Sequence, residues 1–384
     1  MRVSGFTSTG SKRPDALFGA GEQDGLPIRM SQSAGARVWD DTGREYLDFI
    51  MGLGAVALGY GHPDVIAAGV DALERGGIGP LAPEEEECLG EDLASMIPAM
   101  EEVRFLKTGA EAVAAAVRLA RAFTGRDRVM GCGYHGWLDW CSSGAGVPEA
   151  VSSLYTPLPF NEPERCAALI RQAGDRVACV VVEPVIEAEP DPEWLRAIRE
   201  ETRRTGAVLV FDEIKTAFRV SLGGACGRWG GEPDLIVLGK AMANGFPLAA
   251  VGGRAEIMRQ VRNTWISSTM ATEFMSFAAA RATLEVARAT MLPDRLGAAG
   301  HLLFTGLEQL ARSRPDQVTS VGGIPEMCYL RFADEAVSER VARACALQGL
   351  LFKRNAYNFV SLAHTDADIS EALGMLESVL AEVP

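Results

Sequence analysis

The sequence predicts an α/β protein with a mainly parallel sheet, helices on its faces and a second, smaller domain. Between about residues 100 and 253, short β-rich runs alternate with helical patterns, which is typical of parallel sheets. The apolar runs at 180–182 and 208–211 are continuous rather than alternating, as expected for strands buried on both faces. The chain has 384 residues, a length that favours more than one folding unit.

Six segments are expected to form strands of this sheet. Residues 248–253 follow Lys240 too closely for a crossover helix, so we expect this strand to be antiparallel to its neighbour. The other expected strands are 103–106, 128–131, 178–184, 207–213 and 235–240.

The helices and turns also have local signals. Residues 110–124 carry Ala, Val and Leu at helical spacing and end at Gly125, which favours a helix stop. Four glutamates at 84–87 follow Pro83 and suit the first turn of a helix, where negative charge is stabilised. Residues 38–49 predict a hairpin. The last hundred residues carry amphipathic helices and short strands without a chemical motif, which predicts the smaller domain.

Composition excludes several classes of partner. With 37 Lys and Arg against 51 Asp and Glu, the net charge is −14, which would repel nucleic acid and anionic lipid. The first 20 residues lack the apolar core of a signal peptide, and no run approaches the roughly 20 apolar residues of a membrane span, so we expect a cytosolic protein. Eight cysteines without a CxxC pair favour a reducing cytoplasm. Four histidines without ligand-like spacing give no support for a metal site.

Candidate site residues follow the expected strands, whose carboxyl ends are where α/β proteins bind ligands. Thr108, Gly109 and Ala110 form a small-residue turn at a helix start, which could bind phosphate; a capping role for Thr108 explains the same pattern. Tyr134 and His135 lie on a glycine-flanked loop and are suited to stacking on a flat ligand, although a packed surface loop is equally compatible.

The two strongest candidates are a carboxylate and an amine. Asp212 ends a buried strand and needs a cationic or hydrogen-bonding partner; helix capping is the alternative. Lys240 ends an apolar strand, where desolvation could lower its pKa and make it a nucleophile toward a carbonyl. An amine, a carboxylate, a stacking ring and a phosphate cradle are together what pyridoxal phosphate requires.

The motifs also resemble a known family. The segments GYHGWLD, VVVEPV, VFDEIKTAFRV, PDLIVLGKAMANGFPLAAVGG and ISSTMATEF occur in order. With them the chain resembles the class III aminotransferases of fold type I, and among these the glutamate-1-semialdehyde aminomutases. The resemblance implies a mainly parallel seven-stranded sheet with helices on both faces and a smaller α+β domain. It also implies a large domain at 52–290, a small domain formed by 1–51 and 291–384, and a homodimer with shared active sites.

The resemblance further implies roles for individual residues. Lys240 would form the aldimine with pyridoxal 5'-phosphate, and Asp212 would hold the ring nitrogen. The other implied cofactor contacts are the phosphate cradle at Thr108, Gly109 and Ala110, the ring contacts of Tyr134 and Ile214, the nearby His135 and Glu183, and Thr269, which would reach the phosphate in the neighbouring subunit.

The implied activity is an aminotransferase that moves an amino group from an amino compound to an oxo compound, through the Lys240 aldimine and pyridoxamine phosphate. An intramolecular aminomutase and a class III epimerase are alternatives, as is a non-enzymatic sensor with the same fold. A nucleotide-binding dehydrogenase is disfavoured because no GxGxxG opens a helix after the first strand.

Substrate contacts depart from the aminomutase pattern. Its N-terminal arginine has no clear match near Phe18, its tryptophan is replaced by Leu53, and an acidic residue falls on Ala356. Since a cation is the usual partner of a substrate carboxylate, we consider three candidates, Arg29, Lys353 and Arg354. The amino donor, the acceptor and the pathway stay open.

Overall fold

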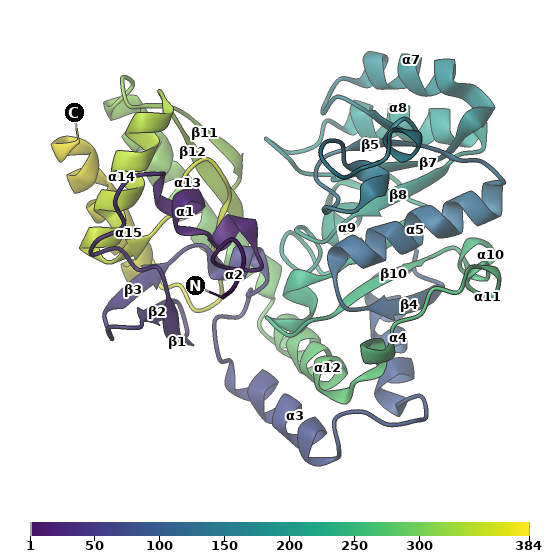
Figure 1. The fold of residues 1–384 in the computed structure, drawn as a ribbon, viewed down its shortest axis with the longest axis horizontal. Coiled ribbons are helices and arrows are strands. Elements are labelled where there is room, and N and C mark those ends of the chain that lie inside the picture. The colour runs from purple at the N-terminus through teal and green to yellow at the C-terminus, as the bar shows by residue number, and fades with distance from the viewer. Residues whose placement is uncertain (1, 384) are drawn as a thin grey trace. The chain divides into compact units, whose positions relative to one another are not determined.

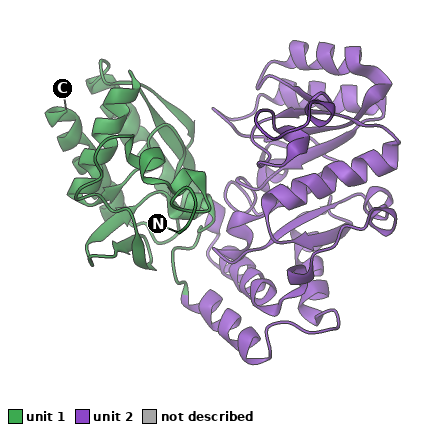
Figure 2. Cartoon of the chain, in the orientation of Figure 1, with its two compact units in different colours: residues 1–62, 294–384 green, residues 63–293 purple. Residues whose placement is uncertain are grey.

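A computed structural model describes residues 2–383, which form two compact units (Figure 1). The sheet unit comprises Pro63–Pro293, and the terminal unit comprises the residues up to His62 together with those from Asp294 onward (Figure 2). These limits describe packing. The sequence-based boundaries, a large domain at 52–290 and a small domain at 1–51 and 291–384, stay predictions.

The sheet unit contains a seven-stranded sheet in the order β4-β10-β9-β8-β7-β5-β6. Every strand runs in the same direction except β10. The mainly parallel sheet predicted from the sequence is therefore confirmed. The strands are β4 (Glu102–Leu106), β5 (Arg128–Cys132), β6 (Tyr155–Pro157), β7 (Val177–Val182), β8 (Val208–Asp212), β9 (Leu235–Leu238) and β10 (Ala249–Gly253).

Strand β10 is antiparallel to both of its neighbours, as predicted, with Ala250 opposite Leu238 of β9 and Phe105 of β4. Strand β9 is shorter than predicted and ends at Leu238. Gly239 continues the extended chain, and Lys240 then adopts a positive φ of 46° and starts the short 3-10 helix η4 (Lys240–Ala243). The chain therefore turns at Lys240 itself.

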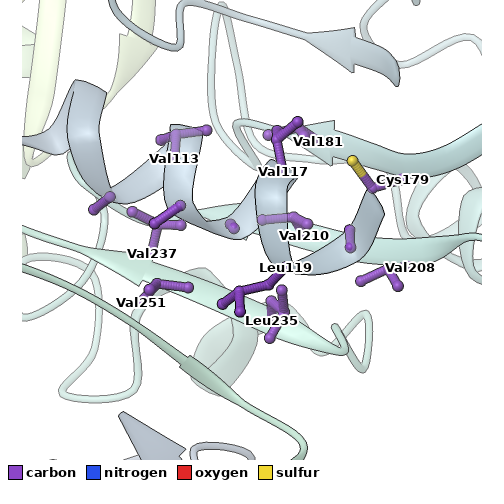
Figure 3. Packing of buried hydrophobic residues seen from close by; sticks show 14 of the residues in the cluster. Val113, Val117, Leu119, Cys179, Val181, Val208, Val210, Leu235, Val237 and Val251 are labelled. Atoms are coloured by element: carbon purple, nitrogen blue, oxygen red, sulfur yellow. The ribbon is translucent and has the colours of Figure 1, made fainter. Parts of the chain in front are cut away.

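Helices cover both faces of the sheet. Helix α5 (Gly109–Thr124) packs its Val113, Val117 and Leu119 on one face, against alternate residues of the central strands (Figure 3). On the other face, α7 (Pro163–Ala173) and α8 (Pro192–Thr205) bury Ile170 and Trp194 against the remaining strand residues. Because adjacent residues of β7 and β8 point to opposite faces, both sets are apolar and the runs are continuous.

Further helices complete the sheet unit. Helix α4 begins at the four glutamates, as predicted, and α3 packs against α12. The longer helices are α3 (Pro63–Glu74), α4 (Glu84–Met96) and α12 (Phe274–Ala289), and the shorter ones are η2 (Asp139–Cys141), α6 (Glu149–Ser152), η3 (Gly174–Arg176), α9 (Gly224–Trp229), α10 (Ala255–Met258), α11 (Val261–Thr264) and η5 (Thr269–Thr272).

The terminal unit contains two small sheets, β1-β2-β3-β13 and β11-β12-β14. Strands β2 and β3 form the predicted hairpin, and β13 joins β3 in parallel, so both chain segments contribute to one sheet. The strands of the terminal unit are β1 (Met30–Ala34), β2 (Arg37–Asp40), β3 (Glu45–Asp48), β11 (Val318–Ile324), β12 (Met327–Phe332), β13 (Leu350–Leu351) and β14 (Asn358–Phe359). The helices of the terminal unit are η1 (Gly10–Lys12), α1 (Pro14–Phe18), α2 (Met51–Gly54), α13 (Leu292–Ser313), α14 (Glu335–Gln348) and α15 (Asp366–Glu382). The first two residues of α13 belong to the sheet unit.

Three observations bear on membranes, metals and redox state. Within residues 2–383, no helix combines the length and apolar character that crossing a bilayer requires. The same residues hold no group of three or more His, Cys, Asp or Glu side chains arranged for a metal. All eight cysteines are free thiols.

Candidate functional site

The carboxyl edge of the sheet carries the predicted site residues. Asp212 is the last residue of β8, Glu183 directly follows β7, and Lys240 comes two residues after β9. Tyr134 follows β5 by two residues. Because these four strands are parallel neighbours, their ends meet at one edge, as α/β ligand sites do.

Asp212 has a defined hydrogen-bond environment. Its Oδ2 lies 2.8 Å from Nδ1 of His135, and its Oδ1 accepts a long hydrogen bond of 3.3 Å from the backbone N–H of Ile214. Both Asp212 and His135 are 3% exposed. The His135 ring stacks on Trp140, with ring centroids 6.0 Å apart. The structure therefore gives Asp212 the partner that a buried carboxylate requires.

The side-chain amine of Lys240 has a lowered pKa. The residue as a whole is half-buried, but its charged end is enclosed by protein, and this burial lowers the pKa from 10.5 to about 8. The positive charges of Lys215 and Arg219 act in the same direction, whereas Glu183 and Asp212 oppose the shift. Near neutral pH, Lys240 therefore has a larger unprotonated fraction than an ordinary lysine.

The start of α5 forms a narrow cradle beside Ile214. A Cβ atom at Gly109 would lie 2.5 Å from Cδ1 of Ile214, and one at Gly136 would lie 2.6 Å from Cβ of Ala110. The first N–H groups of a helix have no acceptor within it, so Gly109 and Ala110 offer two donors to an anion. Thr108 is the N-cap, and its hydroxyl forms a capping box with Glu111.

Glu183 holds the loop that carries Tyr134. One Glu183 oxygen, Oε2, accepts the backbone N–H of Tyr134 at 2.8 Å. The other, Oε1, lies 2.8 Å from Nζ of Lys215. A Cβ at Gly133 would lie 2.5 Å from Oε2, so only glycine fits beside the carboxylate. The Tyr134 residue itself is 71% exposed.

Three site residues were missed by the sequence reasoning. Lys215 pairs with Glu183, Trp140 stacks on His135, and Glu213 is fully enclosed. Glu213 accepts the backbone N–H groups of Ala225 and Cys226 at 2.8 Å, and burial raises its pKa to about 7. The segment VFDEIKTAFRV contains both Lys215 and Glu213, but no local pattern shows which strand end each side chain meets.

Thr269 is exposed and begins the short 3-10 helix η5, in which Ala271 is buried. The residues that follow Thr269 lead into helix α12. Glu273 caps α12 by accepting the N–H of Ser276, and it forms an ion pair with Lys107. Glu273 therefore joins the start of α12 to Lys107, which directly precedes Thr108.

The three candidate substrate cations lie in the terminal unit. Arg29 packs over the Phe6 ring and lines a cavity of about 400 Å³ together with Lys12 and Tyr60. Arg354 donates hydrogen bonds to Glu335 and Ser338. Lys353 is half-buried, and this burial lowers its pKa.

The residues present fit pyridoxal phosphate. The chain supplies an enclosed amine, a carboxylate one strand away, two helix N–H donors and an aromatic loop at one edge. In addition, Nε2 of His135 is buried and has no hydrogen-bond partner within residues 2–383, which leaves a polar atom at this site for a bound group. The fold and this arrangement define a fold type I enzyme that uses pyridoxal phosphate.

The chain belongs to the class III aminotransferases. Residues 18–380 match the family described as Aminotransferase class-III. The predicted family, fold class, cofactor and transaminating activity are thereby confirmed.

The chain is similar to curated proteins named as aminomutases and to solved structures of other proteins, among them an omega-transaminase. The chain is 36% identical to a glutamate-1-semialdehyde 2,1-aminomutase of Thermomicrobium roseum, covering 98% of this chain and 96% of that protein. It is also 36% identical to one of Symbiobacterium thermophilum, covering 94% and 91%. Among solved structures, the PLP internal aldimine form of the FumI protein of Sphingopyxis sp. MTA144 is 26% identical, with a TM-score of 0.89 over 97% of this chain and 96% of that one. An omega-transaminase from Sphaerobacter thermophilus is 26% identical, with a TM-score of 0.84 over 96% and 97%.

Proposed function

We propose that Lys240 is the residue that holds pyridoxal phosphate and moves the proton during amino-group transfer, and that Asp212 holds the ring nitrogen. The observation that carries this proposal is the enclosed Lys240 amine, which lies one strand away from the buried Asp212–His135 pair. An amine with a pKa near 8 serves well as both base and acid near neutral pH.

The residues proposed for the remaining cofactor contacts lie at or near the same carboxyl edge of the sheet. When bound, pyridoxal phosphate supplies an aldehyde that condenses with amines and a ring that withdraws electrons from a neighbouring C–H bond. The N–H groups of Gly109 and Ala110 would hold the phosphate, with Thr108 fixing that turn. Tyr134 and Ile214 would cover the two ring faces, while His135 and Glu183 orient the groups around them.

A half-reaction assay tests this proposal. The purified protein should bind pyridoxal phosphate with visible absorbance, and borohydride should fix the cofactor on the peptide that contains Lys240. A panel of amino acids, diamines and amino sugars should then include a donor that converts the bound aldehyde form to the amine form. Fixation at another lysine, or no fixation, would contradict the assignment.

An intramolecular aminomutase is the second candidate function. It is supported by the two relatives at 36% identity, whose name states that activity. Product analysis without an added oxo acid separates the two functions, because a mutase or an epimerase turns over an amino compound alone. A strict requirement for a second carbonyl compound would favour the aminotransferase.

We infer that a cationic side chain binds the carboxylate of the substrate. Arg29 beside its cavity, Lys353 and Arg354 are the candidates. Replacing Lys353 and Arg354 with alanine should raise KM for an acidic substrate strongly, and an unchanged KM would exclude both residues.

We infer that the protein acts as a homodimer in a reducing cytoplasm. Trp265, Leu81 and Met270 are 89%, 82% and 58% exposed in the single chain, and large apolar side chains at the surface suit an interface. Thr269 adjoins Met270, which fits a contact with the cofactor phosphate of the neighbouring subunit. Eight free thiols agree with a reducing compartment. Sedimentation of the purified protein tests the dimer.

A further inference from the structure

Lys215 belongs to an ion pair at the carboxyl edge of the sheet. Its Nζ lies 2.8 Å from Oε1 of Glu183, and the two side chains are only 14% and 6% exposed. The second oxygen of Glu183 is bonded to the N–H of Tyr134. Lys215 therefore compensates the charge of Glu183, while the other oxygen of this carboxylate holds the backbone of Tyr134.

Glu183 and Lys240 lie at the same carboxyl edge of the sheet, because Glu183 directly follows β7, Lys240 comes two residues after β9, and only β8 separates these two parallel strands. The charged groups that act on the Lys240 amine are Glu183 and Asp212, which attract it, and Lys215 and Arg219, which repel it. Asp212 has its own partner in His135. Lys215 is therefore the cation placed to balance Glu183, the second negative charge near Lys240.

Removing that cation would leave Glu183 poorly compensated. A carboxylate that is nearly closed to solvent is costly without a cation beside it. Lys240 is a cation that Glu183 already attracts, and it carries no carboxylate partner among the ion pairs of residues 2–383. The expected response is that the Lys240 amine keeps its proton to higher pH and compensates Glu183 in place of Lys215.

We propose that Lys215 is a positioning residue for Lys240: by holding Glu183 in an ion pair, it prevents that carboxylate from retaining the Lys240 ammonium and leaves the amine free to react. This inference rests on the proposed role of Lys240. It assigns Lys215 no contact with substrate or cofactor, and it deepens the proposed function by naming what keeps the reacting amine available.

Competitive labelling of the full chain tests the inference without an activity assay. The cofactor is removed with hydroxylamine, and the protein is treated with acetic anhydride over a range of pH values. Mass spectrometry then gives the acetylated fraction of Lys240 relative to exposed lysines. The wild type should show half-maximal reactivity of Lys240 near pH 8, in line with the pKa of its amine.

The variants separate charge from structure. K215M should raise the midpoint for Lys240 by about one pH unit, the scale expected from one nearby charge. K215Q, which can still donate a hydrogen bond to Glu183, should give a similar shift, whereas K215R should stay close to the wild type. The double variant E183Q/K215M should return the midpoint toward the wild-type value, because the carboxylate that holds the proton is gone.

The possible failures are distinguishable. Unchanged midpoints in both K215M and K215Q, with folding verified by circular dichroism, would overturn the inference while leaving the role of Lys240 intact. A shift in K215R equal to that in K215M would overturn it as well, because charge would then not be the cause. Failure of borohydride to fix the cofactor on Lys240 in the wild type would instead overturn the proposed function.

Discussion

The Nδ1 atom of His135 lies 2.8 Å from Oδ2 of Asp212, and both side chains are buried. The two residues come from strand ends that are not adjacent, since β7 lies between β5 and β8. His135 is itself fixed by stacking on Trp140. The chain therefore orients the Asp212 carboxylate through its own residues, and a bound cofactor would meet a preformed partner.

Replacing Asp212 with Asn keeps the shape of the side chain and removes its charge. We expect the half-reaction with a good amino donor to slow by about 10²–10³ or more, the scale for removing an electrostatic group in a closed site. Rapid-mixing absorbance measures this rate. Borohydride should still fix the cofactor on Lys240, which serves as the control, and a rate within a few-fold of the wild type would contradict the role of Asp212.

Two substitutions of His135 test whether it positions Asp212. His135→Asn can place an amide N–H near the position of Nδ1, whereas His135→Phe keeps the ring and offers no donor. The phenylalanine variant should lose about 10–100-fold in kcat, a range typical of supporting hydrogen bonds, and the asparagine variant should retain most activity. The pH profile of kcat should change only in the phenylalanine variant. Equal losses in both variants would show that ring packing, rather than the hydrogen bond, matters.

The cradle at Gly109 can be probed with a double-mutant cycle. Gly109→Ala places a Cβ 2.5 Å from Cδ1 of Ile214, so one of the two must move, and the affinity for pyridoxal phosphate should fall by about tenfold. Ile214→Val removes that Cδ1 atom and should restore much of the affinity in the double variant. Titration by absorbance gives each Kd. Additive effects would show that the two positions do not share the cradle.

The central strands could be predicted because their signal is local. The valines of β7 and the run ending at Asp212 are apolar at every position, and a strand buried between two layers of helices requires this. Strand β6 has only three residues, is partly exposed and ends at Pro157, so its own residues do not mark it. The family resemblance implies a seventh strand but does not locate it in the chain.

In the candidate site, too, local sequence patterns mark some residues and not others. The positions of Asp212 and Lys240 at the carboxyl edge of the sheet could be predicted because polar groups at the ends of apolar strands are conspicuous in the sequence, whereas their roles stay predictions. Lys215 could not be assigned a role, because its partner Glu183 lies on another strand and is brought to it by folding. His135 was expected near the cofactor, but its bond to Asp212 likewise depends on strand order.

The terminal unit contains a histidine that should make stability depend on pH. The Nδ1 atom of His364 accepts the N–H of Ser361 at 2.9 Å, its Nε2 lies 3.1 Å from the carbonyl oxygen of Asp48, and its ring stacks on Phe49. Burial lowers the pKa of His364 from 6.5 to about 4. Between these values the unfolded chain binds a proton that the folded chain does not bind, so the free energy of unfolding falls as the pH falls.

Comparison with His364→Asn isolates this contribution. The asparagine oxygen can accept the N–H of Ser361 but does not titrate, so the variant should be less stable near neutral pH because it loses ring packing. From about pH 7 to about pH 5, the stability difference between wild type and variant should shrink by about 2 kcal/mol. Urea unfolding at the two pH values measures it. A difference that stays constant would show that folding does not lower the pKa of His364, because the shared acid response of all other groups cancels between the two proteins.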